Sequence, residues 1–285
     1  MKNKIRSKIV NFLSSTVGAF LVYIAPSKAK ELASKGMTLV MDKDLTILEK
    51  LMRRAILRKL EKNGNFDTLA DFHQNFWVEK GDNFFTANDS QLENVFIPSC
   101  DFIFDLLKNQ LTKETEKFTT IVEIGTGNGT VLNHLSHKFS QMDKLIGIDL
   151  NKTQTLKNKE KYKNNPRLEF VAGDGFDWLE KNGKSHTIFL TFMGVLEYFT
   201  ENRLQAFFEA ANNLGKIIFI AIEPNDSNHD LELNPRSKVY GPESSFSHNY
   251  PNLLKKAGFN LWHYSKKTFE GDTNYIVFVG AKNWT

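Results

Sequence analysis

The sequence predicts an α/β fold in which a largely parallel sheet carries helices on both faces. Three observations predict it: apolar runs of strand length recur through the last two thirds of the chain, helical patterns separate most of them, and the first run enters a glycine-rich turn. Strands that alternate with helices are typical of parallel sheets, because each crossover returns over a face of the sheet. At 285 residues and 41% hydrophobic content, the chain can form one large core with an appended segment.

The first strand and its turn lie in residues 119–131. After the apolar run, Gly125, Gly127 and Gly129 allow the backbone to turn tightly and to approach a ligand closely. In the dinucleotide-binding pattern the third glycine stands one residue later, at the place held here by Thr130. The turn is therefore expected to hold a nucleoside, and its spacing weakens the case for a nicotinamide dinucleotide.

Two further strands are expected to end in acidic residues. The run 145–150 reaches Asp149, 24 residues beyond Gly125, where a doubly wound sheet presents a carboxylate to ribose hydroxyls. The run 168–175 reaches Asp174. Taken alone, each acid is better explained as a helix cap or a turn residue, so their weight comes from the order in which they follow the glycine turn.

The rest of the sheet follows in sequence. Residues 186–194 and 216–224 predict a fourth and a fifth strand, and 261–264 and 275–279 predict two more after a long connection. The complete pattern is seven strands with helices between them.

This order of elements, with Glu123 opening the spacing Glu-x-Gly-x-Gly-x-Gly, resembles the class I S-adenosylmethionine-dependent methyltransferases over roughly the last two thirds of the chain. The resemblance implies a Rossmann-like seven-stranded methyltransferase sheet, an enzyme, and S-adenosyl-L-methionine as its cofactor. It implies a ribose contact for Asp149, an adenine contact for Asp174 and a cover over the adenine for Phe176. The cofactor-binding residues that it implies are Glu123, Gly125, Thr126, Gly127, Gly129, Asp149, Leu150, Asp174, Gly175, Phe176, Phe192 and Met193.

Candidate catalytic residues flank the connection after the fifth strand. This connection spans roughly 25 residues, which is too long for a plain linker in a compact domain and predicts a functional loop. His248 and Tyr250 stand at its end, and Glu223 lies at the carboxyl end of the strand before it. For His248, a general base and a structural hydrogen bond are equally open interpretations.

The chemistry implied by the resemblance is transfer of a methyl group to oxygen or nitrogen of a small-molecule acceptor by in-line displacement. Two alternatives stay open: a lipid or isoprenoid-like acceptor at a membrane surface, and a non-catalytic module that binds the cofactor. The single cysteine, Cys100, excludes an intrachain disulfide framework, and the sequence has no Cys/His cluster with metal-ligand spacing. We therefore expect a metal-independent reaction.

Charge is divided unevenly along the chain. Residues 1–63 hold 14 Lys and Arg against 5 Asp and Glu, a net +9, whereas the other 222 residues hold 23 against 28, a net −5. A nucleic-acid enzyme is expected to carry basic surface around its catalytic domain, so we do not expect nucleic acid as a partner.

The extreme N-terminus places Lys2, Lys4, Arg6 and Lys8 directly before the apolar run 9–25, a pattern that resembles a signal peptide or a short membrane anchor. The run is short for a membrane span and is diluted by polar residues, which favours an interfacial or packed helix. An intracellular cofactor argues against export and predicts a cytoplasmic protein. Peripheral membrane contact through residues 1–25 and packing in a homodimer both stay open.

Two regions are expected along the chain: a helical N-terminal segment and lid at 1–95, and a methyltransferase core at 96–285 with a long loop at about 224–250. Thr46 and Glu49 have the spacing of a capping box at the start of a helix. The arginines expected on the solvent face of that helix are Arg53, Arg54 and Arg58, and the residues expected to line the lid are His73, Trp77, Phe84 and Phe85.

Overall fold

A computed structural model describes residues 10, 12–34, 45–268 and 274–284 of the chain. Contacts divide the chain into two units. The N-terminal unit comprises Met1–Glu79 and Val239–Ser245, and the core unit comprises Lys80–Lys238 and Phe246–Thr285. The predicted division at residue 95, with a lid before it, stays a prediction.

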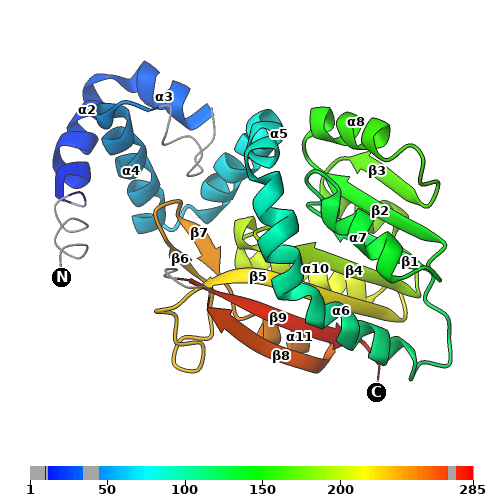
Figure 1. Ribbon diagram of the computed structural model, residues 1–285. Helices are drawn as coiled ribbons and strands as arrows, with labels where there is room; N and C mark the ends of the chain where they lie inside the picture. Colours follow the sequence, from blue (N-terminus) through cyan, green and yellow to red (C-terminus); the bar gives the residue numbers. More distant parts are fainter. Residues whose placement is uncertain (1–9, 11, 35–44, 269–273, 285) are drawn as a thin grey trace. The chain divides into compact units, whose positions relative to one another are not determined.

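The core unit is built on one seven-stranded sheet (Figure 1), with the strand order β3-β2-β1-β4-β5-β9-β8. The first five strands in this order are parallel, and β9 and β8 run antiparallel at one edge. The predicted seven-stranded α/β fold is therefore confirmed. The strands are β1 Thr120–Ile124, β2 Lys144–Asp149, β3 Leu168–Ala172, β4 Thr187–Phe192, β5 Ile217–Asp226, β8 Asn260–Thr268 and β9 Asn274–Lys282.

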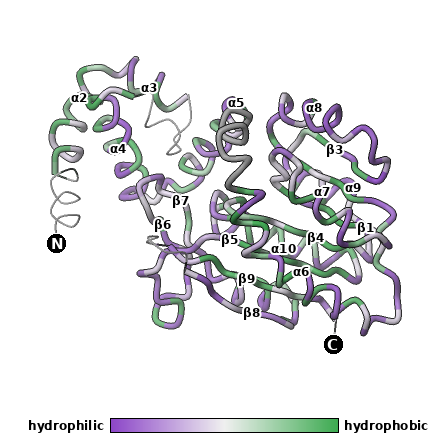
Figure 2. Tube along the Cα trace, viewed as in Figure 1, coloured by the Kyte–Doolittle hydropathy of each residue, from purple (hydrophilic) through white to green (hydrophobic). Residues whose placement is uncertain are grey.

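Helices cover both faces of this sheet, because alternate apolar side chains of each central strand point to opposite faces. Helices α6 and α7 pack on one face with Ile121 and Ile218, and α9, α10 and α11 pack on the other with Val122 and Phe219. Figure 2 shows hydrophobic residues along these central strands. The helices of this unit are η3 Leu92–Phe96, α6 Ile97–Leu111, α7 Thr130–Lys138, α8 Lys152–Lys161, α9 Gly175–Asn182, η4 Leu196–Tyr198, α10 Glu201–Asn212 and α11 Tyr250–Lys256.

The order of the strands reverses beside β1. From β1 the chain continues outward to β2 and β3, and it then returns to β4 on the opposite side of β1. The carboxyl ends of these parallel strands share one edge of the sheet, and open α/β sheets bind ligands at this edge beside the reversal. The glycine turn, Asp149 and Asp174 all follow strands that end there.

The connection after β5 is more ordered than the sequence predicts. Strand β5 continues to Asp226, and two short strands, β6 Lys238–Tyr240 and β7 Ser245–Ser247, pair with each other before α11 begins. The loop therefore contains a small ribbon of its own.

The N-terminal unit is helical, as predicted. Its capping box is confirmed: the Glu49 backbone N–H donates to Thr46 Oγ1 (3.3 Å), and the Thr46 N–H donates to the Glu49 carboxylate (2.8 Å). The prediction that Arg53 faces solvent is wrong, because its side chain is buried within the N-terminal unit, close enough to His73 of α5 for its charge to lower the pKa of that ring. The helices are η1 Ser14–Gly18, a π-helix, α2 Ala19–Ile24, α3 Pro26–Ser34, α4 Ile47–Lys62 and α5 Phe66–Gln91.

Helix α5 leaves the N-terminal unit and enters the core unit. Its His73 side chain is fully buried, with Nε2 lying 3.3 Å from the Ser244 carbonyl oxygen. The predicted lid residues Phe84 and Phe85 belong to the stretch 82–91, whose side chains lie outside the described residues. Over the described part of the chain, no helix is both long enough and apolar enough to cross a membrane.

Candidate functional site

The glycine turn after β1 holds three glycines in a backbone conformation that other residues rarely adopt. Gly125, Gly127 and Gly129 have φ values of 71°, 53° and 75°, the left-handed region that favours glycine. A Cβ at Gly129 would lie 2.8 Å from the rings of Phe170 and Tyr162. Conformation therefore disfavours a side chain at these three positions, and packing also excludes one at Gly129.

Glu123 anchors this turn from the interior of β1. Its side chain is buried, and the Thr126 hydroxyl donates to its Oε2 (2.6 Å). Burial raises the pKa of Glu123 to about 8; the Thr126 hydrogen bond offsets part of this rise, and the nearby Asp149 adds to it. Two of the predicted cofactor residues, Glu123 and Thr126, are thus held together at the start of the turn.

Asp149, at the end of β2, joins the turn to the neighbouring strand. The Gly127 N–H donates to Asp149 Oδ2 and the Asn151 N–H donates to Oδ1, each at 2.8 Å. Burial raises the pKa of Asp149 to about 6, although both backbone hydrogen bonds oppose the rise. Leu150 follows, half-buried, before Asn151 caps α8. Because each carboxylate oxygen accepts more than one hydrogen bond, Asp149 keeps capacity for a further donor.

Asp174, after β3, has the capping role that the sequence left open. Its Oδ1 accepts from the N–H groups of Phe176 (2.9 Å) and Asp177 (3.1 Å), which caps α9. Its Oδ2 forms an ion pair with Arg203 at 2.8 Å, and the Arg203 guanidinium also lies over the Phe176 ring, 5.7 Å from its centroid. Gly175 lies close to β1, because a Cβ there would come within 2.3 Å of Ile124. The adenine contact expected of Asp174 stays a prediction.

The end of β4 has an unusual backbone. Phe192 is buried, and Met193, directly after the strand, has φ 58°, a left-handed conformation that is uncommon for a non-glycine residue. The Met193 N–H donates to the Ile222 carbonyl oxygen of β5 (2.6 Å), and Gly194 follows with φ 99°. The chain therefore turns sharply away from the sheet edge at this point.

Glu223 fixes that turn. Its Oε2 accepts from the N–H groups of Gly194 (3.2 Å), Val195 (3.0 Å) and Leu196 (3.2 Å). The side chain is fully buried, and burial raises its pKa to about 7 against the effect of these hydrogen bonds. The arrangement orders the loop after β4 and offers no exposed carboxylate.

His248 and Tyr250 are both fully buried, with ring centroids 5.4 Å apart. The His248 ring lies beside Phe246, and its Nδ1 is 2.6 Å from the Ser237 hydroxyl. Burial lowers the pKa of His248 to about 4, while the charge of Glu201 opposes this change. His248 is therefore neutral at pH 7 and enclosed by protein.

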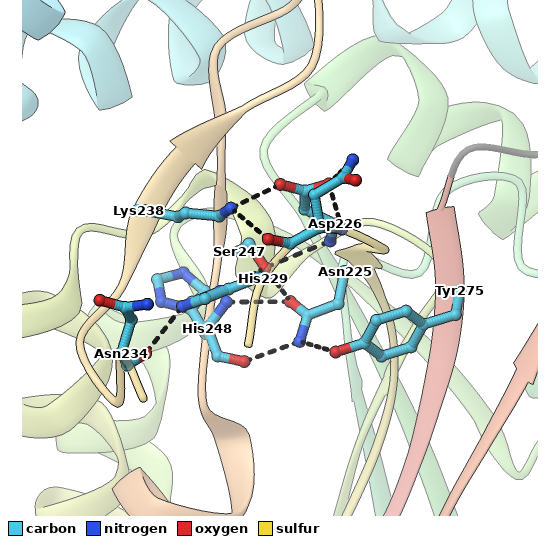
Figure 3. Close-up of polar contacts among 9 residues, drawn as sticks. Asn225, Asp226, His229, Asn234, Lys238, Ser247, His248 and Tyr275 are labelled. Carbon is cyan, nitrogen blue, oxygen red and sulfur yellow. Dashed lines mark hydrogen bonds and ion pairs between the residues drawn. The ribbon is translucent and has the colours of Figure 1, made fainter. Parts of the chain in front are cut away.

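Asn225 is the residue at this end of the sheet that the sequence analysis missed. Figure 3 shows its amide between His248 and Tyr275. Its Nδ2 donates to the His248 carbonyl oxygen (2.8 Å) and to the Tyr275 hydroxyl (3.4 Å), and its Oδ1 accepts from the His248 N–H (2.9 Å) and the Ser247 hydroxyl (3.0 Å). No local sequence signal could have identified it, because its partners lie 22 to 50 residues away.

Around Asn225 the same network joins both ends of the loop. Asp226 forms an ion pair with Lys238 (2.7 Å), and the Asp226 N–H donates to the Ser247 hydroxyl (3.2 Å), as seen in Figure 3. The His229 ring lies between Ser247 (2.9 Å) and the Asn234 carbonyl oxygen (2.9 Å). These polar groups satisfy one another. Across the described residues, no group of three or more His, Cys, Asp or Glu side chains is arranged to hold a metal ion.

Comparison with known proteins agrees with this geometry. Residues 121–216 match a family model described as a methyltransferase domain. A search of curated proteins finds no match. Among solved structures, magnesium protoporphyrin IX methyltransferase from Synechocystis PCC 6803 with bound SAH is 11% identical, with a TM-score of 0.53 over 76% of this chain and 100% of that chain.

Two further structures have the same fold. N-methyltransferase NodS from Bradyrhizobium japonicum WM9, in complex with S-adenosyl-L-homocysteine, is 12% identical, with a TM-score of 0.51 over 73% of this chain and 100% of that chain. The plantazolicin methyltransferase BamL, in complex with a triazolic desmethylPZN analog and SAH, is 14% identical, with a TM-score of 0.52 over 80% of this chain and 98% of that chain. At these identities the likeness establishes the fold.

Proposed function

We propose that this chain is a class I S-adenosylmethionine-dependent methyltransferase that transfers a methyl group to an oxygen or nitrogen atom of a small-molecule acceptor. The observation that carries the proposal is the glycine turn from Glu123 to Gly129, within a stretch that matches a methyltransferase-domain model and tied to Asp149 at the carboxyl edge of the sheet. The magnesium protoporphyrin IX and plantazolicin methyltransferases are named for different acceptors, so we take no acceptor from the similar structures.

The residues at this edge fit S-adenosylmethionine. Three of the five residues from Gly125 to Gly129 carry no side chain, so a ligand can approach the backbone closely at these positions. Asp149 has one backbone donor at each oxygen and retains acceptor capacity for the two ribose hydroxyls. We propose that Asp149 holds the ribose and that Asp174 and Phe176 border the adenine.

When bound, S-adenosylmethionine supplies a methyl group activated by the positive charge on its sulfur. The chain's own contribution is to hold the acceptor in line with that group and to take up the proton of a hydroxyl acceptor. Through three hydrogen bonds, Glu223 fixes residues 194–196 directly after Met193. We assign Glu223 as a positioning residue for the loop at the end of β4.

For His248, a general base and a positioning role make different predictions. Its neutral ring at pH 7 can accept a proton, but its complete burial favours positioning, with Tyr250 packed beside it. If His248 is a positioning residue, His248→Gln should lower the melting temperature and change kcat by less than about tenfold. If His248 is the general base, the same variant should lower kcat by about 100-fold or more and leave the affinity for S-adenosylhomocysteine unchanged. The exposed His137→Gln variant is the control.

Calorimetric titration with S-adenosylhomocysteine, with NAD as the comparison ligand, tests the cofactor site. We expect saturable binding of S-adenosylhomocysteine alone, whereas NAD binding, or binding of neither ligand, would overturn the cofactor assignment. An acceptor screen with a labelled methyl donor follows, run with and without EDTA, because we propose a reaction that needs no metal ion.

A lipid or isoprenoid-like acceptor is a second candidate, favoured by the exposed apolar side chains between Phe12 and Ile24. Turnover of acceptors presented in vesicles, but not of soluble acceptors, would support it. A third candidate is a non-catalytic module. It predicts retained affinity for S-adenosylhomocysteine with no turnover of any acceptor class.

A further inference from the structure

The helical segment 12–24 of the N-terminal unit exposes its large apolar side chains. Tyr23 is 83% exposed, Phe12 68% and Phe20 60%, and Leu13, Val17 and Ile24 are also exposed. Leu13, Val17, Phe20 and Ile24 follow one another at spacings of three or four residues, which places them along one side of a helix. We call the six residues Phe12, Leu13, Val17, Phe20, Tyr23 and Ile24 the outer face.

The opposite side of this segment is buried through small residues. Ser14 and Gly18 are buried, and a Cβ at Gly18 would come within 2.3 Å of the Leu51 carbonyl oxygen of α4. Arg58 Nη1 donates to the Ser15 hydroxyl at 2.9 Å and fixes the same contact. At Ser14 and Gly18 the segment therefore meets α4 by close backbone approach, and further along Leu21 and Val22 pack, partly buried, against Ala29, Leu32 and Met52. The six outer-face side chains stay exposed.

An ordinary surface helix turns its large apolar residues to the core, whereas this segment packs Leu21 and Val22 against the unit and exposes its other six. The polar Thr16 lies among the outer-face residues, and its hydroxyl donates to the Phe12 carbonyl oxygen (2.9 Å), so it presents little free polarity. Within the same unit, Ile47 and Leu48 at the start of α4 are exposed as well. A contiguous exposed apolar surface of this kind marks an interaction site.

Charge decides which partner fits. Residues 1–63, which include the outer face, carry a net charge of +9. Two copies that met through this face would bring two such charges together, which disfavours a homodimer. An anionic lipid surface offers the complementary charge and an apolar layer for the side chains.

We propose that the outer face inserts into the interface of an anionic bilayer, to which the net positive charge of residues 1–63 attracts the chain. The proposal concerns where the enzyme works and holds whichever acceptor is methylated.

Flotation of the full chain with vesicles tests the proposed membrane binding. One set of vesicles contains phosphatidylcholine alone, and the other contains phosphatidylcholine with about 30% phosphatidylglycerol, which makes the surface anionic. We expect binding to the anionic vesicles, weakened at high salt. Phe20→Asp and Ile24→Asp are each expected to weaken it by roughly tenfold or more, because an apolar contact is lost and a negative charge is added. Leu233→Asp, which changes an exposed leucine of the core unit, is the matched control and should bind as the parent does.

Absence of binding to anionic vesicles at low salt would overturn the proposal. Unchanged binding by Phe20→Asp and Ile24→Asp, with circular dichroism equal to that of the parent, would also overturn it. Sedimentation velocity supplies the alternative outcome: a concentration-dependent dimer that these variants abolish, without vesicle binding, would identify a second copy as the occupant. Calorimetry with S-adenosylhomocysteine is run on every variant, so failure of the cofactor site is seen separately.

Discussion

The turn after β1 and the loop after β5 both carry buried polar groups at the carboxyl edge of the sheet, but they use them differently. In the turn, Asp149 and Glu123 accept hydrogen bonds from backbone or side chains nearby, and Asp149 keeps further acceptor capacity. In the loop, Asn225 has its amide fully engaged by partners within the protein. The first arrangement suits ligand binding, whereas the second suits holding a loop in one conformation.

The largest effect on stability and on cofactor binding is expected from Gly129→Val, which changes the turn. The new side chain would collide with Phe170 and Tyr162 at a left-handed φ, so we expect a loss of roughly 3 kcal/mol of stability and of measurable S-adenosylhomocysteine binding. Denaturant unfolding and calorimetry measure both. Gly64→Ala is the control, because Gly64 shares the left-handed φ but has open space around it, and it should keep full binding. Binding retained by Gly129→Val would show that the turn tolerates side chains.

Asn225→Ala attacks the loop instead. It removes four hydrogen bonds and leaves buried partners unsatisfied, so we expect a loss of about 2–3 kcal/mol of stability. At a temperature where the variant is folded, its affinity for S-adenosylhomocysteine should equal that of the parent. Asn228→Ala, in an exposed position of the same loop, should change stability little. Weaker cofactor binding in Asn225→Ala alone would mean that the two regions are coupled.

Asp149→Ala sharpens the comparison within the turn. It removes the acceptor of the Gly127 N–H together with the proposed ribose contact, so the Kd for S-adenosylhomocysteine is expected to rise roughly 10- to 100-fold. Calorimetry measures the change against Asp143→Ala, an exposed acid just before β2. An unchanged Kd would refute the placement of the ribose at this strand.

The smallest effect on stability is expected from a change of pH. Burial raises the pKa of Glu123 from an ordinary 4.5 to about 8 in the folded chain. The folded state therefore binds the proton more tightly than the unfolded state does, and the protein loses stability as the pH rises from about 4.5 through 8. His73 and His248, with pKa values lowered to about 4, act oppositely but only below pH 6.5. Glu223, whose pKa burial raises to about 7, acts in the same direction as Glu123 up to about pH 7. Stability should therefore fall between pH 6.5 and 8, and the part of the fall above pH 7 is assigned to Glu123. Glu123→Gln should flatten that slope, with Glu180→Gln as the exposed control; an equal slope in both would exclude Glu123 as its source.

The same contrast explains how much could be predicted from sequence. The strands, their succession along the chain and the glycine turn were predictable because their signals are local: apolar runs, glycines at fixed spacing, and acids at strand ends. Arg53 was misplaced because its burial depends on tertiary packing, with His73, 20 residues away, near its charge. Asn225 was missed, and the enclosure of His248 was not foreseen, because their partners are brought together only by the folded loop. Propensity and spacing do not encode such long-range pairings.

The contact between Gly18 and the Leu51 carbonyl oxygen has a consequence for how the chain can vary. On the inner side of the segment 12–24, even one added methyl group would separate two backbones. Selection therefore removes substitutions there because they destabilise the fold. On the outer face, a substitution leaves the packing intact and changes only what the protein can adhere to. Selection for folding thus acts on the inner side of this helix, and selection for binding acts on the outer face. A lineage that no longer needed the outer face could replace its apolar residues with polar ones without loss of stability.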